Sequence, residues 1–205
     1  MRSSTFVCLA LVAAGCATLR GRPAPSGKTP PDTAWLAGVR FPEGASRLPV
    51  GQERALVARL EELGSGDFGT YSDAARGLVD SGESVLPYLG HAATHAALDS
   101  RARACLRIVL RTILEDLPEA KVSRHLVSPY PALRVAAAEA AGQRHMTGVA
   151  AKLVDLLDDP ELEVRRAAIT GLRRISNHFF GYRPDDLPAR RARAALLWRE
   201  FWGAS

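Results

Sequence analysis

Apolar residues from position 51 onward recur with the spacing of amphipathic α-helices. Four stripes follow the i, i+3, i+4, i+7 pattern that gives a helix one buried face. The stripes are Leu56, Leu60 and Leu63; Ala102, Cys105, Leu106, Val109, Leu110, Ile113 and Leu114; Leu133, Ala136, Ala137, Ala140 and Ala141; and Val164, Ala168, Leu172 and Ile175. No segment shows the sustained alternation of apolar and polar residues that is typical of a half-buried strand. The pattern therefore predicts an all-α fold.

Helix start and stop signals separate these stripes. Thr70 with Asp73 has the spacing of a capping box, which predicts Thr70 as an N-cap. Ser128 and Asp159 each directly precede a proline, so we expect each to be an N-cap with the proline at the first helical position. Three glycines are expected in breaks or turns: Gly82, Gly142 and Gly148.

The body of the chain is self-similar at a period of 31 residues, which aligns Arg103 with Arg134 and Arg165. The apolar neighbours align as well: Ala102, Leu133 and Val164; Cys105, Ala136 and Ala167; and Leu106, Ala137 and Ala168. A fixed period of about thirty residues is typical of a solenoid, because a single helix pair cannot cover both of its apolar faces. We expect Arg165 to lie at the edge of the stack and to bond backbone or a neighbouring unit.

Several segments resemble HEAT repeats. The residues from Asp158 to Ala168, DDPELEVRRAA, resemble the first helix of that family, and residues 67–89 resemble a variant found in bacterial envelope proteins. The resemblance covers roughly residues 52–202 and implies an α-solenoid of stacked HEAT-like helical hairpins that binds a protein partner. In the best-matched unit an acidic residue accompanies the arginine, and the units at 97–127 and 128–158 lack it. Whether Asp–Arg pairs join successive units is therefore left open.

The N-terminal segment has the features of an export signal. Residues 1–15 contain a basic start and an apolar run that is too short to span a bilayer, which predicts a signal peptide. Residues 11–16, LVAAGC, resemble the lipobox of bacterial lipoproteins, which implies cleavage before Cys16 and acylation of Cys16. Ordinary cleavage nearby and a chance cysteine stay open as alternatives. Ala17 in place of aspartate implies sorting to the outer membrane, facing the periplasm, in the cell envelope.

The segment that follows predicts a tether. Residues 16–50 are rich in proline, glycine, serine and threonine, a composition that favours an extended, semi-rigid chain. Four apolar residues interrupt it, and we expect them to dock on the first helices, with a partner-binding stripe as the alternative: Trp35, Leu36, Val39 and Phe41. Residues 51–205 then form the repeat domain. Its last helix sets Arg190, Arg191 and Arg193 on one side and Ala194, Ala195, Trp198 and Trp202 on another. We expect this helix to cap the stack, with membrane contact and partner binding as the alternatives.

Composition restricts the possible partners. The formal net charge is +5, and loss of residues 1–15 removes only Arg2, so no anionic partner is required. Export from the cytoplasm also argues against nucleic acid. Cys105 lies among apolar residues, which predicts a buried thiol rather than a reactive one.

The sequence offers little chemistry. Residues 64–69, GSGDFG, fit GxGxxG, but a helix precedes them where a dinucleotide site needs a strand. His91, His95 and Asp99 could share a helix face and hold zinc, although a solvated polar face explains them better. We therefore predict no catalytic residue, no metal and no cofactor, and a scaffold that binds proteins. A groove lined by Arg103, Arg107 and Arg111 is the expected binding surface. The alternative is a helical-repeat enzyme or an accessory lyase acting on an envelope substrate.

Overall fold

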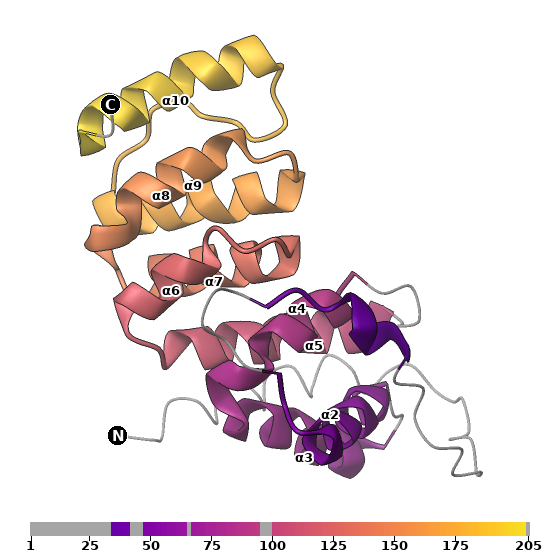
Figure 1. Ribbon diagram of the computed structural model, residues 1–205. Coiled ribbons are helices and arrows are strands. Elements are labelled where there is room, and N and C mark those ends of the chain that lie inside the picture. Colours follow the sequence, from indigo (N-terminus) through magenta and orange to yellow (C-terminus); the bar gives the residue numbers. More distant parts are fainter. Residues whose placement is uncertain (1–33, 42–46, 65–66, 95–99, 204–205) are drawn as a thin grey trace. The chain divides into compact units, whose positions relative to one another are not determined.

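The computed structural model describes residues 34–41, 47–64, 67–94 and 100–203. In these residues the secondary structure consists of helices, with no strand, which confirms the all-α prediction. The α-helices are α2 (Val50–Glu62), α3 (Phe68–Asp80), α4 (Leu86–Ala92), α5 (Ser100–Glu115), α6 (Glu119–His125), α7 (Pro131–Gln143), α8 (Ala150–Asp155), α9 (Leu162–Ser176) and α10 (Pro188–Trp202). Short 3-10 helices are η1 (Ala34–Gly38), η2 (Gly82–Val85), η3 (Thr147–Val149) and η4 (Leu156–Asp158). The chain forms two compact units, residues 1–112 and 113–205, and the boundary lies within α5 (Figure 1).

The segment before α2 docks on the first unit, as its apolar residues predict. Leu36 and Val39 are buried, and the Phe41 ring meets the Tyr88 ring of α4 edge to face at 5.2 Å between centroids. The Trp35 side chain lies outside the described part of the structure. At least residues 36–41 of the expected tether are therefore packed against the helices.

A buried carboxylate joins this segment to α2 and α4. Glu53 of α2 accepts hydrogen bonds from the Tyr88 hydroxyl at 2.9 Å and from Arg47 Nε at 2.6 Å. The Tyr88 oxygen in turn accepts a hydrogen bond from the backbone N–H of Leu48 at 2.8 Å. Burial is the main cause that raises the pKa of Tyr88, so the phenol keeps the proton that it donates to Glu53.

The start of α3 differs from the expected capping box. Asp67 is the N-cap, and its Oδ2 accepts hydrogen bonds from the backbone N–H and the hydroxyl of Thr70, each at 2.8 Å. Thr70 is the third residue of the helix and donates to the cap instead of providing it. The backbone hydrogen bond, followed by the one from the hydroxyl, lowers the pKa of Asp67.

The second unit repeats its helices at the predicted period. Helices α7 and α9 begin at residues 131 and 162, and α6 and α8 begin at 119 and 150, so each interval is 31 residues. Helix α7 packs against α6 and α9, α9 packs against α8, and α10 packs against α8 and η4 (Figure 1). Stacked helical pairs of this kind confirm the solenoid architecture for this unit.

Ser128 and Asp159, which each directly precede a proline, lie outside the helices that they were expected to start. Helix α7 has Tyr130 as its N-cap and α9 has Glu161, two residues after the predicted positions. Ser128 Oγ accepts a hydrogen bond from the backbone N–H of Tyr130 at 3.2 Å, and Asp159 Oδ1 accepts one from that of Glu161 at 2.9 Å. Both side chains therefore stabilise the turn that leads into the helix rather than the helix itself.

Gly142 lies within α7 and not in a break, so this prediction was wrong. A Cβ added at Gly142 would lie only 2.6 Å from the Cα of Gly171 in α9. A Cβ added at Gly171 would lie 2.9 Å from the backbone oxygen of Ala138. The absence of side chains at the two glycines allows the backbones of α7 and α9 to approach closely. Gly148 and Gly82 do lie in short 3-10 turns.

Candidate interaction sites

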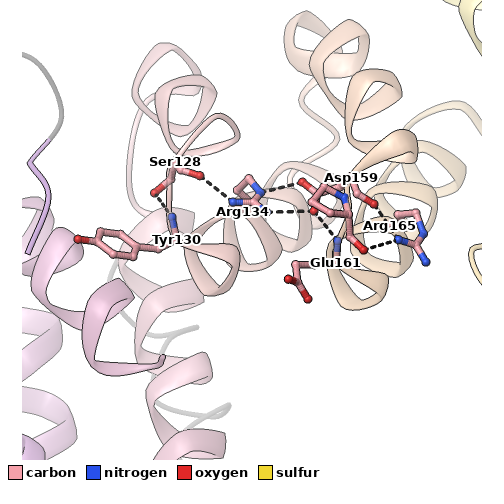
Figure 2. A network of polar contacts seen from close by, with 7 residues as sticks. Ser128, Tyr130, Arg134, Asp159, Glu161 and Arg165 are labelled. Atoms are coloured by element: carbon pink, nitrogen blue, oxygen red, sulfur yellow. Dashed lines mark hydrogen bonds and ion pairs between the residues drawn. The ribbon is translucent and has the colours of Figure 1, made fainter. Parts of the chain in front are cut away.

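An arginine connects successive repeats of the second unit. Arg134 in α7 binds the carboxylate of Asp159 through Nε at 2.8 Å and through its second terminal nitrogen at 3.0 Å (Figure 2). Its remaining nitrogen donates to the backbone oxygen of Ser128 at 2.9 Å. The side chains are 11% and 6% exposed, so the ion pair is largely shielded from water. Its planar, bidentate geometry is one that lysine could not reproduce.

The next arginine in the register makes the equivalent backbone contact. Arg165 donates to the backbone oxygens of Asp159 at 2.7 Å and Pro160 at 2.8 Å, where Arg134 donates to Ser128 (Figure 2). Its Nε donates to the backbone oxygen of Pro184 at 2.9 Å. The contacts confirm the structural role predicted for Arg165. They also show that an Asp–Arg pair, left open by the sequence, exists between Asp159 and the preceding arginine.

Residues 177–187 cover the end of α9. The hydroxyl of the buried Tyr182 donates to the backbone oxygen of Leu157, and Arg173 donates to the backbone oxygen of Tyr182 at 2.9 Å. Burial raises the pKa of Tyr182 and lowers the pKa of Arg173. Sequence reasoning missed both residues. The tyrosine in residues 180–184, FGYRP, was the available signal, because a buried tyrosine combines apolar area with a hydrogen bond.

Helix α10 buries one face and exposes another. Ala195 and Trp198 are fully buried, and the Trp198 ring contacts Phe180 edge to face at 4.8 Å between centroids. Ala194 and Trp202 are half-buried. Several residues of α10 are exposed, Arg190 and Phe201 among them, and four of the exposed residues form what we call the α10 outer face: Arg193, Leu196, Leu197 and Glu200.

The arginines predicted to line a groove lie on α5 in the first unit. Arg103, Arg107 and Arg111 are four residues apart, which places them along one side of that helix. Arg103 and Arg107 are exposed, whereas Arg111 is half-buried. The binding role of these three residues stays a prediction, as does the acylation of Cys16, which lies outside the described residues.

The remaining candidates concern metal, cofactor and membrane chemistry. The described residues contain no group of three or more His, Cys, Asp or Glu side chains that could hold a metal ion. His91 belongs to α4, whereas His95 and Asp99 lie outside the described residues. The GxGxxG segment connects α2 to α3, with residues 65–66 not described, and Cys105 is a buried free thiol. No helix within the described ranges is long and apolar enough to cross a membrane.

Comparison with known proteins supports the repeat assignment. Residues 117–195 match the family described as HEAT repeats, which supports a HEAT-repeat protein and agrees with the helical pairs of the second unit. HEAT repeats typically mediate protein–protein interaction. No curated protein and no solved structure matches the chain.

Proposed function

We propose that the protein is a non-catalytic, lipid-anchored scaffold that mediates protein–protein interaction in the bacterial cell envelope. One observation carries this proposal: the shielded polar side chains of the repeats are bound within the repeats themselves. Arg134, Asp159 and Arg165 bind one another or backbone at the junctions between helices. Polar groups satisfied in this way hold successive repeats in register, which is what a binding platform requires.

Exposed arginines on α5 offer a surface for the partner. Arg103 and Arg107 extend from neighbouring turns of one helix, with Arg111 a turn further on. Guanidinium groups bind carboxylates in a planar, bidentate geometry, so an acidic segment of a protein partner suits this surface. The HEAT-repeat match supports a protein partner over a small-molecule substrate.

Acylation of Cys16 would confine the scaffold to a membrane surface. The lipobox resemblance implies that this surface is the outer membrane, with the scaffold facing the periplasm. Each buried CH₂ of an acyl chain contributes about 0.8 kcal/mol, so two or more chains would anchor the protein stably.

Two experiments test the anchor and the scaffold separately. Wild type and Cys16→Ser are fractionated into membrane and soluble material, and the intact mass of each is measured. Wild type should be membrane-bound with the added mass of acyl chains, and Cys16→Ser should be released. Retention of an unmodified Cys16→Ser protein on membranes would refute the lipid anchor.

For the scaffold, proteins are crosslinked in intact cells and those captured by wild type, Arg107→Glu and Arg124→Glu are compared. Both arginines are exposed on helices, so the two variants change the charge equally. A specific partner should be captured by wild type and Arg124→Glu and lost with Arg107→Glu. Equal capture by all three would exclude the α5 surface, and the absence of any specific protein would contradict the scaffold itself.

A further inference from the structure

The α10 outer face combines exposed apolar residues with charges of both signs. Leu196 and Leu197 are 54% and 44% exposed, so two adjacent apolar side chains face away from the buried side of α10. Arg193 and Glu200 are exposed as well, and neither forms an ion pair with another described residue. They are seven residues apart, too far to pair with each other along the helix.

The order of these four residues is self-complementary. Arg193 lies three positions before Leu196, and Glu200 lies three positions after Leu197. An antiparallel second helix, related by a two-fold axis at the level midway between the two leucines, therefore brings Leu196 and Leu197 of both copies together. The same axis sets Arg193 beside Glu200 of the second copy, and the symmetry creates each contact twice.

We propose that the α10 outer face binds a second copy of this chain, as an antiparallel helix pair closed by two Arg193–Glu200 ion pairs around four leucines. This inference does not rest on the lipid anchor or on the α5 surface. A closed two-fold contact uses the same patch on both copies, so it yields dimers and no larger assembly.

Charge decides between this occupant and a membrane. A helix that lies in an anionic lipid surface has basic residues on its polar side and apolar residues on its inserted side. Here Glu200 and Arg193 flank the two leucines on the same exposed side of α10. Insertion of that side would bring a carboxylate close to anionic headgroups, whereas pairing with a second copy neutralises both charges.

The size of the contact predicts a weak dimer. Helix α10 has 15 residues, which corresponds to a length of about 22 Å. One helix pair of that length buries less area than the roughly 1,600 Å² of a standard stable interface. We therefore expect association that depends on concentration, with dissociation in the micromolar to millimolar range, strengthened wherever copies are confined to one surface.

Charge reversal tests this arrangement in the full chain carrying Cys16→Ser, which removes any contribution of acylation. Sedimentation velocity is measured over a concentration series for the parent, Arg193→Glu, Glu200→Arg and the double variant. The parent should form dimers, and each single reversal should weaken dimerisation about 10- to 100-fold, because like charges then face each other at two places. The double variant should recover the parent's affinity.

An equimolar mixture of the two single variants gives the sharpest readout. The Arg193→Glu chain presents two acidic residues and the Glu200→Arg chain presents two basic ones, so the mixture should dimerise more tightly than either variant alone. Matched controls are Arg124→Glu on α6 and Glu61→Arg on α2, which carry the same charge changes on exposed helical positions. Both controls should dimerise like the parent.

Several outcomes would overturn the proposal. A parent that stays monomeric, single variants that dimerise like the parent, or a mixture that does not recover would each do so. Oligomers larger than dimers would exclude the closed two-fold contact. Binding of the monomeric parent to vesicles of anionic lipid, increased by Glu200→Arg, would identify the membrane as the occupant instead.

Discussion

Substitution of Gly142 by alanine tests the close approach of α7 and α9. The added Cβ would lie 2.6 Å from the Cα of Gly171, a distance that real Cβ contacts essentially never show. The obstructing atom belongs to the backbone, so no side-chain rotation can relieve the contact. The two helices must move apart, and their buried alanines must lose part of their packing.

Two opposing effects set the expected magnitude. Replacement of glycine by alanine inside a helix stabilises it by up to about 1 kcal/mol, because glycine loses more backbone entropy on folding. Overpacking of a close-packed interior costs about 1–3 kcal/mol, and more where backbone has to shift. We therefore expect Gly142→Ala to lower the free energy of unfolding by about 1–2 kcal/mol despite the gain in helix propensity.

Urea denaturation followed by far-UV circular dichroism measures this change, with Gly51→Ala as the control. Gly51 lies in the first turn of α2, and a Cβ there would meet nothing within 4 Å. The control should be as stable as wild type or more stable by up to about 1 kcal/mol. The reasoning fails if Gly142→Ala proves at least as stable as wild type, because helix propensity would then outweigh the contact.

Two further substitutions probe the polar contacts of the second unit. Arg134→Ala should lower the free energy of unfolding by about 3 kcal/mol because it leaves Asp159 buried without its partner. In urea titrations Arg166→Ala, which breaks an exposed ion pair, should cost at most about 0.5 kcal/mol, and equal losses would contradict the distinction. Tyr182→Phe should cost about 1–2 kcal/mol because the Leu157 carbonyl loses its donor. Burial raises the pKa of Tyr182, so its stabilising effect should be complete below pH of about 10 and decline as the pH rises through the folded-state pKa. A stability difference between wild type and Tyr182→Phe that does not narrow at alkaline pH would argue against this account.

The sequence period was the most informative feature for the fold. The interval between the starts of α7 and α9 equals the shift that aligns Arg103, Arg134 and Arg165. This agreement has a physical reason. A helix starts where its own local residues allow, and a solenoid repeats the same local residues, so the helix boundaries repeat with them.

Individual caps were harder to predict than the period. The oxygen of Ser128 or Asp159 can accept a hydrogen bond from the N–H two residues later in a turn, or cap a helix that begins at once. Which geometry forms depends on the direction in which the chain leaves the preceding helix. Gly142 posed a similar ambiguity, because a glycine marks a break as readily as a close helix contact, and only its neighbour Gly171 distinguishes the two.

The contacts of Asp159 explain why the site was only partly predictable. Its carboxylate binds Arg134 in helix α7 of the preceding repeat, while its backbone oxygen accepts a hydrogen bond from Arg165 of its own repeat. The second contact is local and recurs between Ser128 and Arg134, so the register alone predicts a shared position for the arginines. The ion pair between Arg134 and Asp159 joins residues 25 positions apart. It depends on how two repeats stack, and the sequence of a single repeat does not determine that. One period earlier the position of Asp159 is held by Ser128, and a serine cannot supply a carboxylate. The repeats therefore share their arginine-to-backbone contacts but differ in their side-chain ion pairs. Because of this difference, one junction between repeats can be more stable than the next.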